Sequence, residues 1–210
     1  TQPIIGTQIK FKYKELTGLI PIIAKNDLGY RNLVKLSSCS YLNHKDFNEP
    51  FCEFNDLKQH KDGLIVTLGG LHSLIGELFK RDRLHEIKEI YIFLKKLLQN
   101  NFYIEIQRHF ENEEKNFEDF LISISSELRL PLISSQEVFY LKEDMAEAHD
   151  ALICVGEKSF VDDKNRKKFK NNHFFRNSFD LEQLFKDIPE ALENNYNFPR
   201  KFSFKPKNTK

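Results

Sequence analysis

The sequence has no excess of either charge, few cysteines and no long apolar run, and each absence excludes a class of protein. Its 32 basic and 31 acidic residues leave a formal net charge of +1, so any contact with nucleic acid must come from local patches. Three widely spaced cysteines argue for a reducing compartment and against a disulfide framework or a zinc ribbon. No apolar run approaches the roughly 20 residues of a membrane-spanning helix, so we expect no membrane partner and a cytoplasmic location.

Motifs that indicate common chemistries are also missing. There is no glycine-rich phosphate loop, no Gly-x-Ser-x-Gly nucleophile elbow, and no Asp-x-Asp pair to hold magnesium ions in a polymerase palm. The histidines show no ligand spacing such as His-x-His, so local sequence does not build a metal site.

The length of 210 residues suffices for one well-buried domain, or one domain with a small appendage. Apolar residues make up 40% and charged residues 30%, which is ordinary for a folded soluble protein. The sequence starts at Thr1, its one methionine is Met145, and Gln2 to Gly6 have the character of a strand already under way. We therefore expect a piece of a longer protein.

Hydrophobic periodicity predicts strands that alternate with helices. The strands are expected near 2–6, 9–13, 18–24, 63–68, 102–108 and 131–135, and the helices near 27–42, 73–79, 84–98, 113–128, 142–155, 180–186 and 188–196, with one short helix within 43–62. This alternation predicts an α/β fold with a mostly parallel sheet or barrel. In such folds, functional side chains lie at the carboxyl ends of the strands. Pro21 indicates an edge position or a bulge for its strand.

The strand at 102–108 carries the most informative pattern. Its two-residue period places Phe102, Ile104 and Ile106 on one face, and Tyr103, Glu105 and Gln107 on the other, with His109 continuing the polar face. Polar side chains that end in a histidine are typical of a barrel site. The alternative is a satisfied hydrogen-bond network or a wet edge, which is the more common role of such groups.

Other candidates are weaker on the residues alone. Glu137 follows the strand at 131–135 and is a possible metal ligand or general base, although a single carboxylate more often faces water. His149 lies mid-helix and favours a structural hydrogen bond. The basic clusters at 164–168 and 200–207, with aromatic residues nearby, are compatible with strand contact by stacking, but solvated loops are the more common meaning.

Six short segments, taken in order along the chain, resemble those of a known protein family. They are Pro3 to Gly6 (PIIG), Ala24 to Ser38 (AKNDLGYRNLVKLSS), Asp62 to Ile65 (DGLI), Phe102 to His109 (FYIEIQRH), Glu147 to Cys154 (EAHDALIC) and Leu184 to Asn194 (LFKDIPEALEN). In this order they resemble the amino-terminal polymerase-and-histidinol-phosphatase (PHP) domain of bacterial DNA polymerase III alpha subunits, with alphaproteobacterial members the most similar in character. The segment at 24–38 is highly specific.

The resemblance implies a distorted TIM-like parallel α/β barrel, incomplete at its N-terminus. Residues 1–186 are expected to form the PHP domain, and residues 187–210 an exit helix and basic tail toward the polymerase core. In intact members, the strand ends hold divalent metals that support phosphoesterase or 3′–5′ exonuclease chemistry. The family's ligands include an early His-x-His and a Thr-Asp-His upstream of Thr1, a glutamate at the position of Gln8, a histidine that matches His109, and an Asn-Asp-x-His that falls on residues 136–139.

The residues at the family's ligand positions change this expectation. Gln8 supplies no anionic oxygen and Phe139 cannot bind a metal. Glu137 retains a carboxylate, on a side chain that is longer than the family's aspartate. We therefore expect no catalytic, cofactor-binding or metal-binding residue in this segment, and we interpret Gln8, His109, Glu137 and Phe139 as vestigial positions. A fold can outlive its site, because packing and metal ligation depend on different residues.

The resemblance also implies a parent protein that is a DNA-directed DNA polymerase, with Mg²⁺ in its core. Its implied partners are the polymerase core of the same chain, a proofreading subunit, a sliding clamp, and DNA through the parent. The leading hypothesis is a degenerate PHP domain that acts as a brace or docking surface. The alternatives are an active phosphoesterase or exonuclease that uses His109 and Glu137 with Zn²⁺ or Mn²⁺, and an unrelated α/β enzyme.

Overall fold

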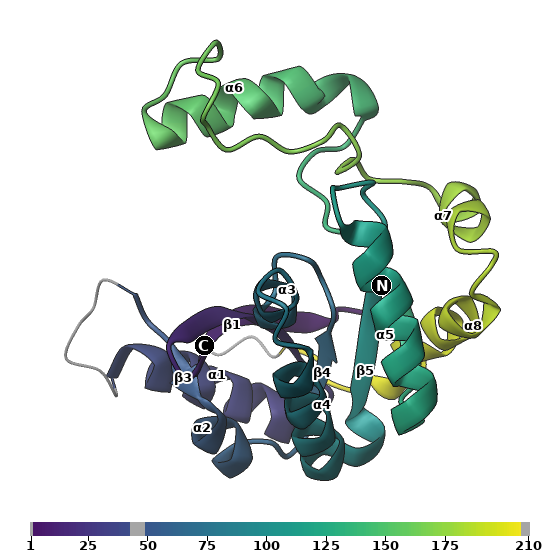
Figure 1. Cartoon of the computed structure of the whole chain (residues 1–210). Coiled ribbons are helices and arrows are strands. Elements are labelled where there is room, and N and C mark those ends of the chain that lie inside the picture. The colour runs from purple at the N-terminus through teal and green to yellow at the C-terminus, as the bar shows by residue number, and fades with distance from the viewer. Residues whose placement is uncertain (1, 43–48, 207–210) are drawn as a thin grey trace.

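The computed structural model describes residues 2–42 and 49–206, and it confirms the α/β class (Figure 1). Each helix expected from the sequence is present within a few residues of its predicted bounds. The strands are β1 (Ile5–Tyr13), β2 (Leu16–Ala24), β3 (Cys52–Glu53), β4 (Leu64–Leu68), β5 (Phe102–Gln107) and β6 (Leu132–Ser135). The helices are α1 (Asp27–Leu42), α2 (Phe54–Gln59), α3 (Leu74–Phe79), α4 (Leu84–Leu98), α5 (Glu114–Leu128), α6 (Ala146–Glu157), α7 (Ser178–Leu184) and α8 (Pro189–Asn197), with 3₁₀ turns η1 (Gln99–Asn101), η2 (Glu143–Met145) and η3 (Phe198–Lys201).

Within the described ranges, the strands form one open six-stranded sheet in the order β3-β1-β2-β4-β5-β6. Strands β4, β5 and β6 run parallel, and β3 runs parallel to β1. Strands β1 and β2, in contrast, form an antiparallel hairpin, and β2 is also antiparallel to β4. The hairpin is antiparallel because only Lys14 and Glu15 join the two strands, and so short a connection permits only an antiparallel pair. Lys14 adopts a left-handed conformation with φ 54° to close the turn.

Pro21 lies within the sheet, which corrects the edge position expected from its missing N–H. It pairs with Gln8 in the hairpin, whereas the ladder between β2 and β4 includes only residues 22–24 of β2. Pro21 therefore lies just beyond the end of that ladder, where its strand does not have to donate a hydrogen bond to β4.

Side chains alternate between the two faces of the sheet, as the period of β5 predicts. Phe102, Ile104 and Ile106 enter the main hydrophobic core, which lies between the sheet and helices α1, α3, α4 and α5 (Figure 1). Tyr103 points to the other face, where it forms a small second cluster with Phe202 and two strand residues. The polar residues at the strand ends share this second face, so the sheet separates the core from the candidate site.

The start of α1 packs closely against the turn that precedes β4. The side chain of Asn26 accepts a hydrogen bond from the Gly29 N–H at 2.9 Å, and the Lys25 N–H donates to the Gly63 carbonyl oxygen at 2.8 Å. A Cβ atom on Gly29 would lie 1.8 Å from that same carbonyl oxygen. Gly63 itself has φ +74°, a conformation that glycine adopts without strain. These contacts explain the Asn-x-x-Gly pattern within residues 24–38.

Arg108, directly after β5, connects the C-terminal helices to the sheet and the helices packed on it, which we call the body. Its guanidinium donates two hydrogen bonds to Glu118 of α5, at 2.7 and 2.8 Å, and two to Asp187, at 2.7 and 2.8 Å. It also donates to the Leu184 carbonyl oxygen and lies 5.0 Å from the centre of the Phe185 ring. Planar bidentate pairs of this kind fix geometry as well as charge.

Helix α8 packs on β6 and joins the same body. The side chains of Asn194 and Asn195 donate to the carbonyl oxygens of Leu132 and Ser134, both at 2.7 Å. Residues 207–210 of the expected basic tail lie outside the described part. The boundary expected between residues 186 and 187 stays a prediction, although α8 shares the main core through Ala191.

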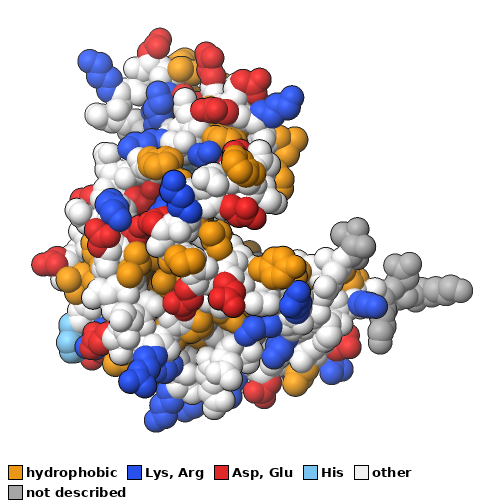
Figure 2. Space-filling model, turned by 90° about the vertical axis from the view of Figure 1, so that its right-hand side faces the viewer, with side chains coloured by type: hydrophobic (Ala, Val, Ile, Leu, Met, Phe, Trp, Pro, Cys, Tyr) orange, Lys and Arg blue, Asp and Glu red, His pale blue; other side chains and the backbone are white. Residues whose placement is uncertain are grey.

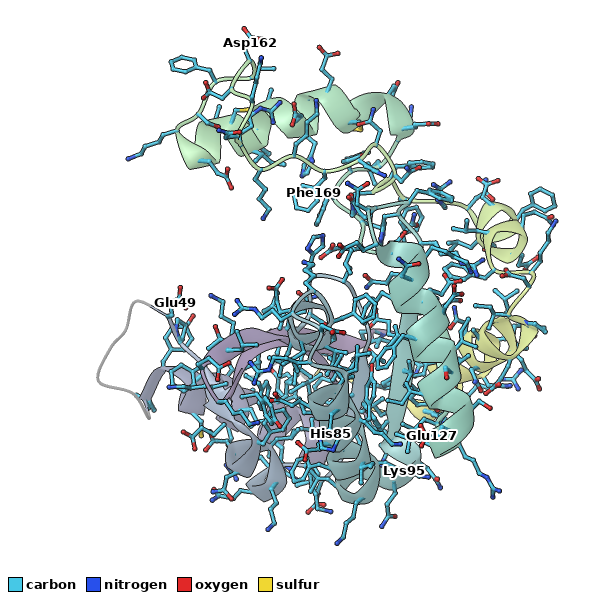
Figure 3. All side chains as sticks on the ribbon, in the orientation of Figure 1. Glu49, His85, Lys95, Glu127, Asp162 and Phe169 are labelled. Atoms are coloured by element: carbon cyan, nitrogen blue, oxygen red, sulfur yellow. The ribbon has the colours of Figure 1, made fainter. Side chains whose placement is uncertain are left out.

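Helix α6 and the loop at 158–170 form an arm that stands away from the sheet (Figure 1). Figure 2 shows the arm above the body, with a notch between them. Two hydrogen bonds from Arg166 to Asp150, each 2.6 Å, hold the loop on the helix. The arm meets the body at Phe169, whose ring contacts His72 edge-on with 5.8 Å between ring centres (Figure 3). None of the helices in the described ranges is long and apolar enough to cross a membrane.

Candidate functional site

A polar pocket lies at the carboxyl ends of β4, β5 and β6, where the α/β fold places functional residues. Its volume is about 420 Å³, and we call it the strand-end pocket. Gln8 and Glu137, two of the positions singled out in the sequence, line it together. They also line a smaller adjoining cavity of about 30 Å³, together with His72, Ser73 and Glu105. The fold therefore brings Gln8 and Glu137 together across more than 100 residues of sequence.

Glu105 is the most deeply buried charged group of the strand-end pocket, with 6% of its surface exposed. One carboxylate oxygen accepts hydrogen bonds from Gln107, at 2.9 Å, and from the Ser135 hydroxyl. The other oxygen has no hydrogen-bond partner among the described residues. The interpretation of β5 as a satisfied network thus holds for one oxygen only. A buried carboxylate with a free oxygen is costly, which marks this pocket as a polar site within an otherwise apolar fold.

His109 lies behind the strand-end pocket, 3% exposed, and both of its ring nitrogens face a partner. Its Nε2 accepts a hydrogen bond from the Glu137 backbone N–H at 3.1 Å, and its Nδ1 lies 3.4 Å from a Glu114 oxygen. Glu114 also accepts the backbone N–H groups of His109 and Phe110. Burial acts to raise the pKa of Glu114, but the hydrogen bonds from His109 and Phe110 outweigh it and lower that pKa. His109 thus joins β5, α5 and the segment after β6.

Four stacked rings extend from His109 into the arm. The His109 and His173 rings are parallel, with centres 4.2 Å apart, and Phe139 stacks between His173 and His149, at 4.6 and 5.1 Å. His173 is fully buried and its Nδ1 lies 3.0 Å from the Glu137 carbonyl oxygen. Burial, and then the neighbouring His109, lower the pKa of His173, so this imidazole is uncharged at neutral pH. Phe139 is a packing residue of this stack.

These contacts test whether the residues fit the metal cluster that the family fold implies. The lone pair of His109 Nε2 is already used by the Glu137 N–H, and Phe139 has no donor atom. Gln8 is neutral and exposed. In the described ranges, no three His, Cys, Asp or Glu side chains are arranged to hold a metal ion. A multinuclear centre needs several deprotonated ligands that converge, so the residues present do not fit one.

The sequence does not reveal two parts of this arrangement. His173 lacks ligand spacing and no pattern marks Glu114, yet both contact His109. His173 follows the arm, 64 residues beyond His109 in the chain, so no periodicity relates the two. His149 stacks on Phe139, where the sequence favours a structural hydrogen bond.

Comparisons with known proteins show the family to which this chain belongs. The family model described as "PHP domain" matches residues 1–109, and the chain belongs to the PHP domain family. Its relatives include the "DNA polymerase III subunit alpha" of Borreliella burgdorferi, 36% identical over 82% of this chain and 15% of the relative. That of Rickettsia bellii is 32% identical over 97% of this chain and 17% of the relative. That of Caulobacter vibrioides is 30% identical over 87% of this chain and 16% of the relative.

The resemblance to this region of the DNA polymerase III alpha subunit is therefore confirmed. The chain spans 15–17% of the length of these relatives.

Proposed function

We propose that this chain is the PHP region of a bacterial DNA polymerase III alpha subunit, and that the region is a degenerate domain that braces or docks the polymerase core. The single observation that carries the proposal is the structural role of His109. Its Nε2 accepts a hydrogen bond from the Glu137 N–H, whereas a metal ligand would need that lone pair to be free. The replacement of a family glutamate by Gln8, and of a histidine by Phe139 within a ring stack, supports the same conclusion.

The bracing role is supported by the Arg108 contacts. They join the end of β5, helix α5 and the segment between α7 and α8, so the part of the chain that follows the site is fixed to the part that forms it. We propose that the C-terminal helices, held in place by these contacts, position the polymerase core of the same chain. In this proposal the proofreading subunit, the sliding clamp and DNA are partners of the whole protein in the cytoplasm.

The whole protein is proposed to be a DNA-directed DNA polymerase that extends a primer with Mg²⁺ in its core. Similarity to the alpha subunits over 82–97% of this chain supports this part of the proposal. Its test is primer extension by the full-length product of the gene, with Mg²⁺ and deoxynucleoside triphosphates. Template-dependent extension supports the proposal, and a full-length product without it contradicts this part.

A second candidate is an active phosphoesterase or 3′–5′ exonuclease that uses Zn²⁺ or Mn²⁺. The observation that favours it is the convergence of Glu105, Glu137 and His72 on one small cavity. Burial lowers the pKa of His72, which leaves its imidazole neutral and able to bind a metal. His109 does not line this cavity, and its ring nitrogens face the Glu137 N–H and Glu114.

Release of terminal nucleotides from a labelled oligonucleotide separates the two candidates. In the presence of Mg²⁺, Mn²⁺ or Zn²⁺ we expect the purified chain to release no more label than the metal alone, because no set of free ligands assembles the metals that activate water. The matched variant is Glu137→Gln, which keeps the size of a half-buried side chain and removes its charge. Metal-dependent release that is lost in Glu137→Gln contradicts the degenerate-domain proposal.

A further inference from the structure

A second cavity, of about 560 Å³, lies at the opposite end of the sheet from the strand-end pocket, beside the points where β5 and β6 begin. Its walls carry Lys95 of α4, Arg129 after α5 and Lys201 of η3, together with Gln99 and Asn100 of η1. We call it the basic pocket. Figure 3 shows Lys95 at the lower end of the body, away from Phe169, which marks the arm above the site.

The charges of the basic pocket are not balanced locally. The residues that line it, all within the described ranges, include no carboxylate. Lys95 donates a hydrogen bond to the Leu128 carbonyl oxygen at the end of α5. This cation therefore has a partner, the C-terminus of a helix. Lys201 lies 4.9 Å from the centre of the Tyr103 ring and 3.5 Å from the Asn100 carbonyl oxygen. The described residues offer the Arg129 guanidinium no hydrogen bond or ion pair.

The backbone at two of these positions is unusual. Gln99 has φ 52° and ψ −120°, and Arg129 has φ 50° and ψ 52°; each follows the last turn of a helix. Glycine is the residue that such a position normally favours, because it has no Cβ atom. Strained non-glycine residues concentrate at functional positions. At 129, where glycine would suit the backbone better, the chain carries an exposed arginine that lines the pocket.

From this geometry we propose that the basic pocket binds a phosphate group, supplied by the backbone of a nucleic-acid strand. Arg129 binds two phosphate oxygens with its planar fork, and Lys201 and Lys95 add point charges. The nearly neutral chain attracts nucleic acid only through such local patches. This inference rests on the proposed function for the identity of the polyanion, whereas phosphate binding itself requires only the pocket.

The test is binding of a short fluorescent oligothymidylate to the 210-residue chain at low salt, measured by anisotropy. The pocket variant is Arg129→Gln/Lys201→Gln, and the matched control is Lys164→Gln/Lys168→Gln, which removes the same charge from the exposed loop of the arm. We expect the pocket variant to bind about tenfold more weakly, and its salt dependence to fall by about 0.7 in log–log slope, because the contact with one phosphate is lost. The control should bind within about twofold of wild type.

Inorganic phosphate, added alone and followed by calorimetry, separates the two sources of the ligand. Phosphate binding that the pocket variant loses, without oligonucleotide binding, supports the phosphate site and assigns it to a free ligand. The proposal is overturned if the pocket variant binds both ligands as wild type does, if wild type binds neither, or if the control loses as much affinity as the pocket variant. Thermal unfolding of both variants checks that each is folded. Neither nuclease activity nor primer extension enters this test, so its failure is distinct from failure of the proposed function.

Discussion

Replacement of Arg108 by alanine is expected to lower the free energy of unfolding by about 3 kcal/mol or more. The guanidinium is the main partner of Glu118, whose side chain is 4% exposed, so its removal leaves a buried carboxylate with only Lys115, at 3.2 Å, as a counter-charge. The measurement is urea unfolding of wild type and variant, followed by circular dichroism. A loss below about 1 kcal/mol would show that the Arg108 contacts add no more than an exposed ion pair and would contradict the bracing role.

Two further variants divide this effect between the partners of Arg108. Asp187→Asn should cost less than about 1 kcal/mol, because the Asp187 side chain is 58% exposed. The double variant Arg108→Met/Glu118→Gln should recover much of the loss, since no buried charge is then left unpaired.

The contribution of Asp187 also has a defined pH dependence. Its hydrogen bonds with Arg108 lower the pKa of Asp187 below its ordinary value of 3.8. A lowered folded-state pKa means that the unfolded state binds the proton more tightly, so the stabilisation is present above pH 3.8 and is lost as the pH falls through the lowered value. The cost of Asp187→Asn should therefore be constant near neutral pH and disappear in acid.

Substitution of Gly29 by alanine should lower the free energy of unfolding by more than about 3 kcal/mol, or prevent folding altogether. The added Cβ would lie 1.8 Å from the Gly63 carbonyl oxygen and 2.6 Å from its carbonyl carbon. Both contacts are with backbone, so relief requires helix α1 to move away from the turn before β4. That movement would break the hydrogen bond between Lys25 and Gly63. Thermal unfolding and yield of folded protein measure the effect.

Gly156 provides the matched control, because it also lies in a helix but a Cβ atom added there would have no other atom within 4 Å. Gly156→Ala should raise stability by about 0.5–1 kcal/mol through helix propensity alone. Equal effects of the two substitutions would mean that the contact between α1 and the turn at Gly63 does not constrain the fold.

The elements of this fold could be predicted from the sequence because each has a local cause. The spacing of Ile87, Ile90, Tyr91 and Leu94 marks α4, and all four are buried as predicted. The antiparallel orientation of β1 and β2 could not be predicted in this way, since the connecting residues Lys14 and Glu15 lack the glycine or asparagine that normally signals a hairpin. Strand orientation depends here on connection length, which is a weaker signal than hydrophobic periodicity.

The candidate site was predictable only in part, for a different physical reason. Gln8 is identified by resemblance to the family, Glu137 also by its place after a predicted strand, and the fold places both in one pocket. The partners of His109 come from segments that no pattern connects: Glu114 from the start of α5 and His173 from the segment after the arm. Such contacts arise from tertiary packing alone.

We propose that in this chain the fold has persisted without the metal site of its family. The main core and the Arg108 contacts involve none of the family's ligand positions, whereas Gln8 pairs with Pro21 in the hairpin and Phe139 packs in the ring stack. Among the described residues at the strand ends, Glu105, Gln107 and Ser135 hydrogen-bond to one another, and one oxygen of Glu105 has no partner. In this proposal the domain serves as a scaffold without chemistry.

The most direct test of this central claim is the metal content of the purified protein, measured by mass spectrometry after expression with Zn²⁺ and Mn²⁺ supplied and removal of loosely bound ions. We expect far less than one equivalent of either metal, with no difference between wild type and Glu137→Gln. One or more equivalents of zinc or manganese per chain, lost in Glu137→Gln or His109→Ala, would contradict the claim that this fold has outlived its metal site.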